Sequence, residues 1–296
     1  MYSKSDHVKY SIQFRIFAIR LYGFISKPLN FRGFWRFCHI VGAGVHPETA
    51  VSIKMGSGRL EIPLKDPYWS QMICSKYRYE PEIQNFLLKN ADPELSFVDC
   101  GANIGFWSVF AAIQIGVTEI TSIEPNPEIF KILAKNLKIN SVESKLIEGA
   151  ISDEESKTVY LFVPRKRGFA VAGSLTNLAD SDLRYEVKVV SLYEVISKAI
   201  SVTSRVIVKL DIEGAEIAAF ESIRTLLDRD LLIIFEDHGN DSNSKNLKWF
   251  LENSSYNVYF IESSGNCVRV ENILQANRFK QDKRRGYNFL ATGNHF

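Results

Sequence analysis

A turn of small and acidic residues follows the first apolar run in the middle of the chain. It reads DCGANIG, from Asp99 to Gly105. Its glycines would let the backbone approach a ligand, and free N–H groups at the start of the next helix would favour a negative part of that ligand. The Asp99 carboxylate would repel a pyrophosphate but suits an ammonium group, directly or through water. The turn predicts a ligand with an amino-acid part, although tight strand-to-helix turns also use glycine for structural reasons alone.

Glu124 ends the next apolar run, 19 residues after Gly105. A carboxylate at the end of a second strand is placed to accept both hydroxyls of a ribose, which indicates an adenosine-containing ligand. The ligand that joins an adenosine to a methionine is S-adenosylmethionine. A nicotinamide dinucleotide is the alternative, and the missing third glycine of the GxGxxG pattern argues against it.

Titratable residues also lie within or just after two later apolar runs, VIVKL and LLIIF. The catalytic candidates among them are Lys209, Asp211, Glu213, Glu236 and His238. Because side chains alternate along a strand, Lys209 and Asp211 share one face. A neutral hydroxyl is a poor nucleophile, so methyl transfer to it requires a general base or a divalent metal ion.

Two schemes use these residues. In the first, His238 is the general base and Asp211 orients it. In the second, Asp211, Glu236 and Asp237 hold Mg²⁺ against the acceptor oxygens, because hard oxygen ligands suit that ion. We favour the metal-free scheme and leave Mg²⁺ open, because the sequence does not show whether the three carboxylates converge.

From Leu95 onward, short apolar runs alternate with helical stretches, and the candidate residues lie at the ends of these runs. This order predicts an α/β protein with a doubly wound, mostly parallel sheet and helices on both faces. Ligands bind at the carboxyl ends of such strands. We also expect a small β-hairpin at residues 50–64, a helix at 81–89, one strand in KLIEGAI, and a closing pair of strands in YNVYFIE and NFLAT.

Five sequence blocks resemble, in this order, the FkbM family of S-adenosylmethionine-dependent methyltransferases: FVDCGANIGFWS, SIEPNPEIFKILAKNLKIN, EGAISDEES, VIVKLDIEGAE and LLIIFED. The resemblance covers about residues 77–240 and implies a Rossmann-like class I methyltransferase fold. The cofactor-binding residues that it implies are Asp99, Gly101, Ala102, Asn103, Gly105, Glu124, Asn126, Ala150 and Ile151. One departure is Gly149, which stands where many methyltransferases have an acid that contacts the adenine, so backbone groups of Ala150 and Ile151 are the candidates for that contact.

The acceptor is expected to be a small molecule or a glycan. Methyltransferases of nucleic-acid bases usually carry an Asn/Asp-Pro-Pro-aromatic motif where this chain has DIEG, so nucleic acid is disfavoured. An insertion between Tyr160 and Tyr185 is a candidate acceptor lid, and its candidate substrate-binding residues are Arg165, Arg167 and Ser174. The predicted function is O-methylation of a hydroxyl on a carbohydrate or glycoconjugate. A polyketide, peptide or lipid-linked acceptor is the alternative, and a non-catalytic binding module is the alternative class.

Residues 1–48 are expected to form a basic helical extension, and residues 49–296 the methyltransferase domain. The first 40 residues carry seven Lys or Arg and one acid, a net charge of +6 in a chain whose total is +2. They contain neither a secretory signal pattern nor an apolar run of the ~18 residues that a spanning helix needs. The extension could pack on the domain, form a homodimer interface or contact an anionic membrane. The 46% hydrophobic content and four scattered cysteines indicate a globular protein of a reducing compartment, so a cytoplasmic location is expected, with membrane association left open.

Overall fold

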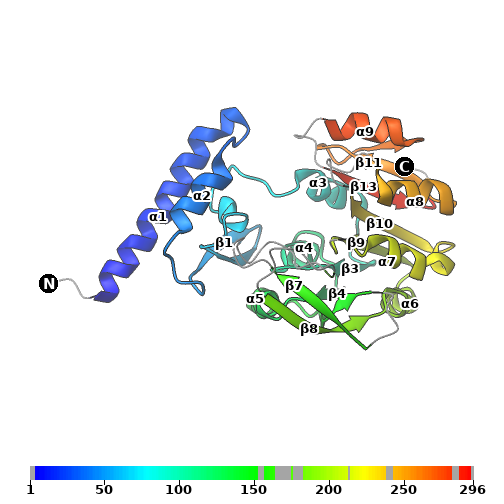
Figure 1. Ribbon diagram of the computed structural model, residues 1–296, viewed down its shortest axis with the longest axis horizontal. Coiled ribbons are helices and arrows are strands. Elements are labelled where there is room, and N and C mark those ends of the chain that lie inside the picture. The colour runs from blue at the N-terminus through cyan, green and yellow to red at the C-terminus, as the bar shows by residue number, and fades with distance from the viewer. Residues whose placement is uncertain are drawn as a thin grey trace. The chain divides into compact units, whose positions relative to one another are not determined.

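The computed structural model describes residues 4–152, 157–163, 175, 183–212, 214–237, 243–281 and 287–294. The chain divides into two compact units (Figure 1). The first unit contains residues 4–55 and 59–79, and the second contains residues 80–152 and most of the chain that follows.

The first unit combines helices with a hairpin. Its elements are α1 (Lys4–Ser26), η1 (Lys27–Leu29), α2 (Phe34–Gly42), β1 (Ala50–Met55), β2 (Gly58–Pro63) and η2 (Trp69–Ile73). The expected hairpin is therefore confirmed, with β1 and β2 paired in a sheet of their own. Gly23 lets α1 approach the end of η2, because a Cβ there would lie 2.6 Å from the Cys74 side chain. Within the described part of the chain, no helix has both the length and the apolar character needed to cross a membrane.

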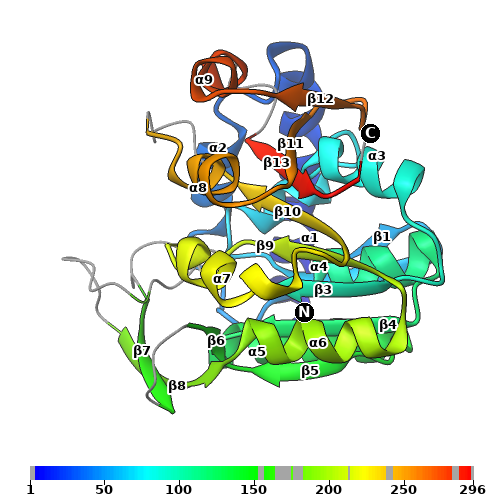
Figure 2. The same cartoon turned by 90° about the vertical axis from the view of Figure 1, so that its right-hand side faces the viewer.

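The second unit is built on an eight-stranded sheet, counted over the described residues. Its order is β12 (Cys267–Val270), β11 (Asn257–Ile261), β13 (Asn288–Thr292), β10 (Asp230–Glu236), β9 (Arg205–Leu210), β3 (Ser96–Cys100), β4 (Glu119–Glu124) and β5 (Lys145–Glu148). Figure 2 shows the strands stacked in this order, from β12 at the top to β5 at the bottom. Strands β10, β9, β3, β4 and β5 are parallel, whereas β13 is antiparallel to β10 and β11. The predicted mostly parallel α/β fold and the closing pair of strands are confirmed.

The chain changes direction across the sheet between β3 and β9. It runs outward from β3 to β4 and β5, and it returns to β9 on the other side of β3. Open α/β sheets bind ligands at such a switch point, beyond the carboxyl ends of the two strands. Asp99 and Lys209 are register partners on these strands, so the turn after β3 and the residues after β9 meet there.

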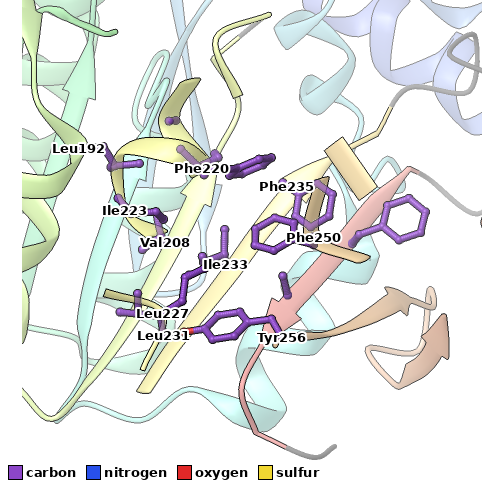
Figure 3. Packing of buried hydrophobic residues seen from close by; sticks show 14 of the residues in the cluster. Leu192, Val208, Phe220, Ile223, Leu227, Leu231, Ile233, Phe235, Phe250 and Tyr256 are labelled. Carbon is purple, nitrogen blue, oxygen red and sulfur yellow. The ribbon is translucent and has the colours of Figure 1, made fainter. Parts of the chain in front are cut away.

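Helices cover both faces of the sheet. They are α3 (Pro81–Asn90), α4 (Phe106–Phe110) continued by a π-helical turn η3 (Ala111–Ile115), α5 (Pro127–Ile139), α6 (Leu192–Val202), α7 (Glu216–Ser222) with η4 (Arg224–Leu226), α8 (Lys245–Asn253) and α9 (Ile273–Gln281). Residues of α6, α7 and α8 pack over Val208 and Ile233 on one face (Figure 3). The Phe220 and Phe250 rings meet there at 4.5 Å between centroids, and each such buried side chain contributes about 1.5–3 kcal/mol. On the other face, α4 packs against β3 and β4.

KLIEGAI forms two strands, so the single strand expected there is wrong. β5 ends at Glu148, and β6 (Ala150–Ile151) joins β8 (Leu183–Val190) and β7 (Thr158–Val163) in a separate three-stranded sheet. Gly149 permits the change of sheet, because a Cβ at this position would lie 2.8 Å from the Lys188 carbonyl oxygen.

Candidate active site

The turn after β3 is closed by its own hydrogen bonds. Each backbone N–H from residue 101 to residue 105 donates to an oxygen of the turn or of the end of β4, at 2.8–3.0 Å. The acceptors are the Ile123 carbonyl for Gly101 and Ala102, the Glu124 carboxylate for Asn103, the Asn103 side chain for Ile104, and the Ala102 carbonyl for Gly105. These five N–H groups are therefore used within the turn, which curls back onto β4. The free N–H groups expected at the start of the next helix belong to α4, which begins at Phe106, and their contact with a ligand stays a prediction.

Gly101 allows the ends of β3 and β9 to meet. Its φ of +77° lies in the left-handed region, and a Cβ there would fall far inside contact distance of the Asp211 carbonyl oxygen. Asp211 in turn donates its backbone N–H to the Cys100 carbonyl at 3.0 Å. Glycine is thus required at this point of the sheet for both conformation and space.

We expect Gly101→Ala to destabilise the protein far more than Gly214→Ala. Both glycines have a left-handed φ, +77° and +94°, so alanine adds roughly 1–2 kcal/mol of backbone strain at either position. Only at Gly101 would the new Cβ also collide with backbone, since no described atom lies within 4 Å of a Cβ at Gly214. Thermal unfolding of the two variants measures the difference, and equal losses of Tm would contradict the close approach.

Glu124 is held by backbone N–H groups. Its carboxylate accepts from Asn103 and from Asn126, both at 2.9 Å, and its side chain is almost fully buried. Burial raises the pKa of this carboxyl to about 7, against the two hydrogen bonds, which lower it. Each oxygen of an ionised carboxylate can accept a further bond, so the ribose contact stays a prediction. Asn126 also caps α5, because its side-chain oxygen accepts from the Glu128 N–H at 3.0 Å.

Asp99 lies under α4 and is fully buried. One carboxylate oxygen accepts from the Ser108 hydroxyl at 2.6 Å, whereas the other, Oδ1, has no hydrogen-bond partner among the described residues. Burial raises the pKa of Asp99, and the charge of Lys209 opposes that rise. This buried acceptor is therefore available to a donor group of a ligand.

Lys209 links Asp99 to the end of β9. Its ammonium lies 3.1 Å from the Asp211 carboxylate, and its side chain is 4% exposed. Burial alone would lower the pKa of Lys209, but Asp211, Glu80 and Asp99 raise it above its ordinary value overall. The lysine therefore places a fixed positive charge between the turn after β3 and the carboxyl end of β9.

Glu80 also belongs to this group, although it is not among the site residues predicted from the sequence. It precedes α3 with a left-handed φ of 39°, a conformation that is uncommon for residues other than glycine. Its carboxylate accepts from the Trp107 indole N–H at 3.1 Å and from the Asn288 amide at 3.4 Å. Burial raises the pKa of Glu80 to about 7; Lys209 lowers it, and the acids Asp211, Glu236 and Glu82 raise it further. In the sequence, an acid before Pro81 is typical of any helix start. Nothing in the local sequence therefore distinguishes Glu80 from an ordinary acid at the start of a helix.

Glu236 and Asp237 point to opposite faces of the sheet. Phe235 pairs with Leu210, so alternation places Glu236 on the face of Lys209. Asp237 instead forms a buried ion pair with Lys280 at 2.5 Å and accepts from the Leu247 N–H at 3.1 Å. The Mg²⁺ scheme therefore loses one of its three carboxylates. In the part of the chain that the structure describes, no group of three or more His, Cys, Asp or Glu is arranged to hold a metal ion.

Several predicted site residues have no described contacts here. His238, Glu213, Arg165, Arg167 and Ser174 lie outside the described residues, and their roles stay predictions. Ala150 and Ile151 are buried and pair with β8, and their contact with adenine likewise stays a prediction.

Comparison with known proteins identifies the family. The family model of the methyltransferase FkbM domain matches residues 99–286, which is more than half of the chain. This chain belongs to the FkbM methyltransferase family. The resemblance seen in the sequence blocks is thereby confirmed, together with the class I methyltransferase fold that it implied. A search of curated proteins gives no match.

Solved structures similar to this FkbM family member are distant. A methyltransferase FkbM from Methylobacillus flagellatus is 15% identical with a TM-score of 0.41; the match covers 68% of this chain and 44% of that one. A precorrin-6y C5,15-methyltransferase from Geobacter metallireducens is 16% identical with a TM-score of 0.41, covering 72% and 87%. TYW2 from M. jannaschii in complex with AdoMet is 13% identical with a TM-score of 0.38, covering 83% and 87%. This chain thus spans less than half the length of the Methylobacillus protein.

Proposed function

We propose that this family member is an S-adenosylmethionine-dependent O-methyltransferase that acts on a hydroxyl of a carbohydrate or glycoconjugate. The observation that carries the proposal is the charged group at the carboxyl ends of β3 and β9, where Glu80 lies in the field of Lys209 and Asp211 beside the turn after β3. A polyketide, peptide or lipid-linked hydroxyl remains the alternative acceptor.

The residues present fit S-adenosylmethionine. The unpaired Asp99 Oδ1 is a buried acceptor suited to an ammonium group, directly or through water. Glu124 retains acceptor capacity for ribose hydroxyls beside its two backbone donors. When bound, S-adenosylmethionine supplies an electrophilic methyl group carried on a sulfonium.

The chain's own contribution is to position an acceptor hydroxyl and to remove its proton. Methyl transfer to a hydroxyl oxygen would release the hydroxyl proton, which a base of this chain would accept. Glu80 is proposed as that base, because a carboxyl with a pKa of about 7 is poised for proton transfer at neutral pH. Lys209 fixes Asp211, whose carboxylate can orient a hydroxyl-rich acceptor by accepting hydrogen bonds. His238 oriented by Asp211 is the rival base.

Transfer of a labelled methyl group tests the function. Extracts from the source cells are separated into glycan, lipid and peptide fractions, and each is incubated with the protein and labelled S-adenosylmethionine. We expect stable label in the glycan fraction, as an O-methyl ether on mass analysis, and no loss of activity with EDTA. Label confined to peptides or lipids would select the alternative acceptor, activity that requires added Mg²⁺ would restore a metal scheme, and label in no fraction would contradict the proposal.

A further inference from the structure

Helix α1 has two apolar faces. Ile19 and Gly23 are buried against the rest of the first unit. On the opposite side, a row of large side chains is exposed: Phe14, Phe17, Leu21, Phe24 and Ile25, with exposed fractions from 48% to 72%. At about 3.6 residues per turn these five lie within an arc of about 100° and extend along about 17 Å of the helix. They are called the apolar stripe below.

The stripe is the densest part of a wider pattern in the first unit. Leu29, Trp35 and Ile40 are also exposed large apolar residues. Monomeric proteins rarely expose contiguous apolar patches larger than about a few hundred Å². Ordinary exposure of single residues does not account for five such side chains on one face of one helix.

The charges around the stripe are all positive. Arg20, Lys27, Arg32 and Arg36 are exposed, and the sequence contains no Asp or Glu between Asp6 and Glu48. At about 100° per residue, Arg20 and Lys27 lie along one edge of the stripe. Arg15, in contrast, is engaged by the carbonyl oxygens of Val41 and Ala43.

We propose that α1 lies in the surface of an anionic phospholipid bilayer, with the apolar stripe in the acyl boundary and the exposed cations at the headgroups. Aromatic and aliphatic side chains on the exposed face, with Arg and Lys beside them, are the groups that hold a helix at an anionic membrane surface. A second copy of the chain is a poorer occupant, because pairing two stripes would bring together two sets of cations without an acid to offset them.

Vesicle flotation of the full-length protein tests this inference, which does not depend on methyl transfer. Vesicles of phosphatidylcholine alone are compared with vesicles that also contain phosphatidylserine, at low and high salt. We expect binding to the anionic vesicles, and loss of that binding with salt. Phe14→Ser/Phe17→Ser should weaken it at least about 10-fold, and Arg20→Gln/Lys27→Gln about 30-fold, since each cation near such a surface contributes a factor of about 5.

The matched control is Val202→Ser/Leu274→Ser, which removes two exposed apolar side chains of the second unit. It should bind like the wild type, and unchanged thermal unfolding and S-adenosylmethionine binding show that all variants are folded. Absence of binding to both vesicles, equal binding to both, or equal losses in the control and the stripe variant would overturn the proposal. So would a concentration-dependent dimer that is lost in Phe14→Ser/Phe17→Ser without any effect on vesicles.

Discussion

Glu80→Gln is expected to lower kcat by about 10²–10⁴-fold, the usual contribution of a general base, while leaving the affinity for S-adenosylmethionine nearly unchanged. Glutamine keeps the size of the side chain and an oxygen that can accept from the Trp107 indole, which lies 3.1 Å away in the wild type. The variant therefore removes the proton acceptor and preserves the packing around it. Steady-state rates of methyl transfer from labelled S-adenosylmethionine to the acceptor, together with calorimetric titration of the cofactor, measure the two effects separately.

Glu82→Gln is the matched control. Glu82 is the next acid along the chain, is almost fully buried, and accepts from the same Asn288 amide at 2.9 Å. The control variant makes the same Glu-to-Gln change beside the same Asn288 amide. Because Glu82 has no proposed role in proton transfer, kcat should change little in this variant. An equal loss of kcat in both variants would mean that the effect comes from Asn288 or from packing.

The pH profile identifies the group that titrates. Because a pKa of about 7 leaves Glu80 protonated in acid, the wild-type rate should rise with pH through about 7 and then level off. Glu80→Gln should lose this step, whereas His238→Gln should keep it. The reverse outcome would assign the base to His238.

Stability should show the opposite trend with pH. The folded-state pKa of Glu80 is raised from 4.5 to about 7, so its contribution to stability is fully present below pH 4.5 and is lost as the pH rises through 7. Glu80→Gln should therefore gain stability relative to the wild type between pH 5.5 and pH 8, as seen by thermal unfolding at both values.

Local patterns in the sequence were sufficient to predict the parallel sheet, the turn after β3 and the position of Glu124. Each of these depends on residues that lie within one strand and the turn that follows it, so their order along the chain already places them at one edge of the sheet. Glycine spacing and apolar runs carry that information directly.

Partners far apart in the sequence were not predictable in this way. Glu80 meets Asn288 across 208 positions, and Asp237 is engaged by Lys280 across 43. Nothing near Asp237 in the sequence shows that its carboxylate pairs with a lysine of α9 and does not join the other acids at the carboxyl ends of the strands. The division of KLIEGAI between two sheets likewise depends on β8, because the space around Gly149 is set by Lys188 and Val190.

Glu124→Ala is expected to weaken the binding of S-adenosylmethionine by about 1.5–3 kcal/mol, the scale of hydrogen bonds to a charged group. Loss of the carboxylate removes the acceptor proposed for the ribose and also leaves the Asn103 and Asn126 N–H groups without their present acceptor. Glu124→Gln should weaken the binding of S-adenosylmethionine nearly as much. A glutamine amide has only one oxygen, whereas the carboxylate offers one oxygen to each of the two backbone donors. Glu128→Gln is the control, since Glu128 ends in an exposed ion pair with Lys131.

Calorimetric titration at two pH values completes this test. Because burial raises the pKa of Glu124 to about 7, the carboxylate that accepts ribose hydroxyls is more populated at pH 8 than at pH 6. Wild-type affinity should therefore increase over that interval, and the affinity of Glu124→Ala should increase less. An alanine variant that binds S-adenosylmethionine as tightly as the wild type at both pH values would remove Glu124 from the ribose site and leave it as the residue that closes the turn after β3.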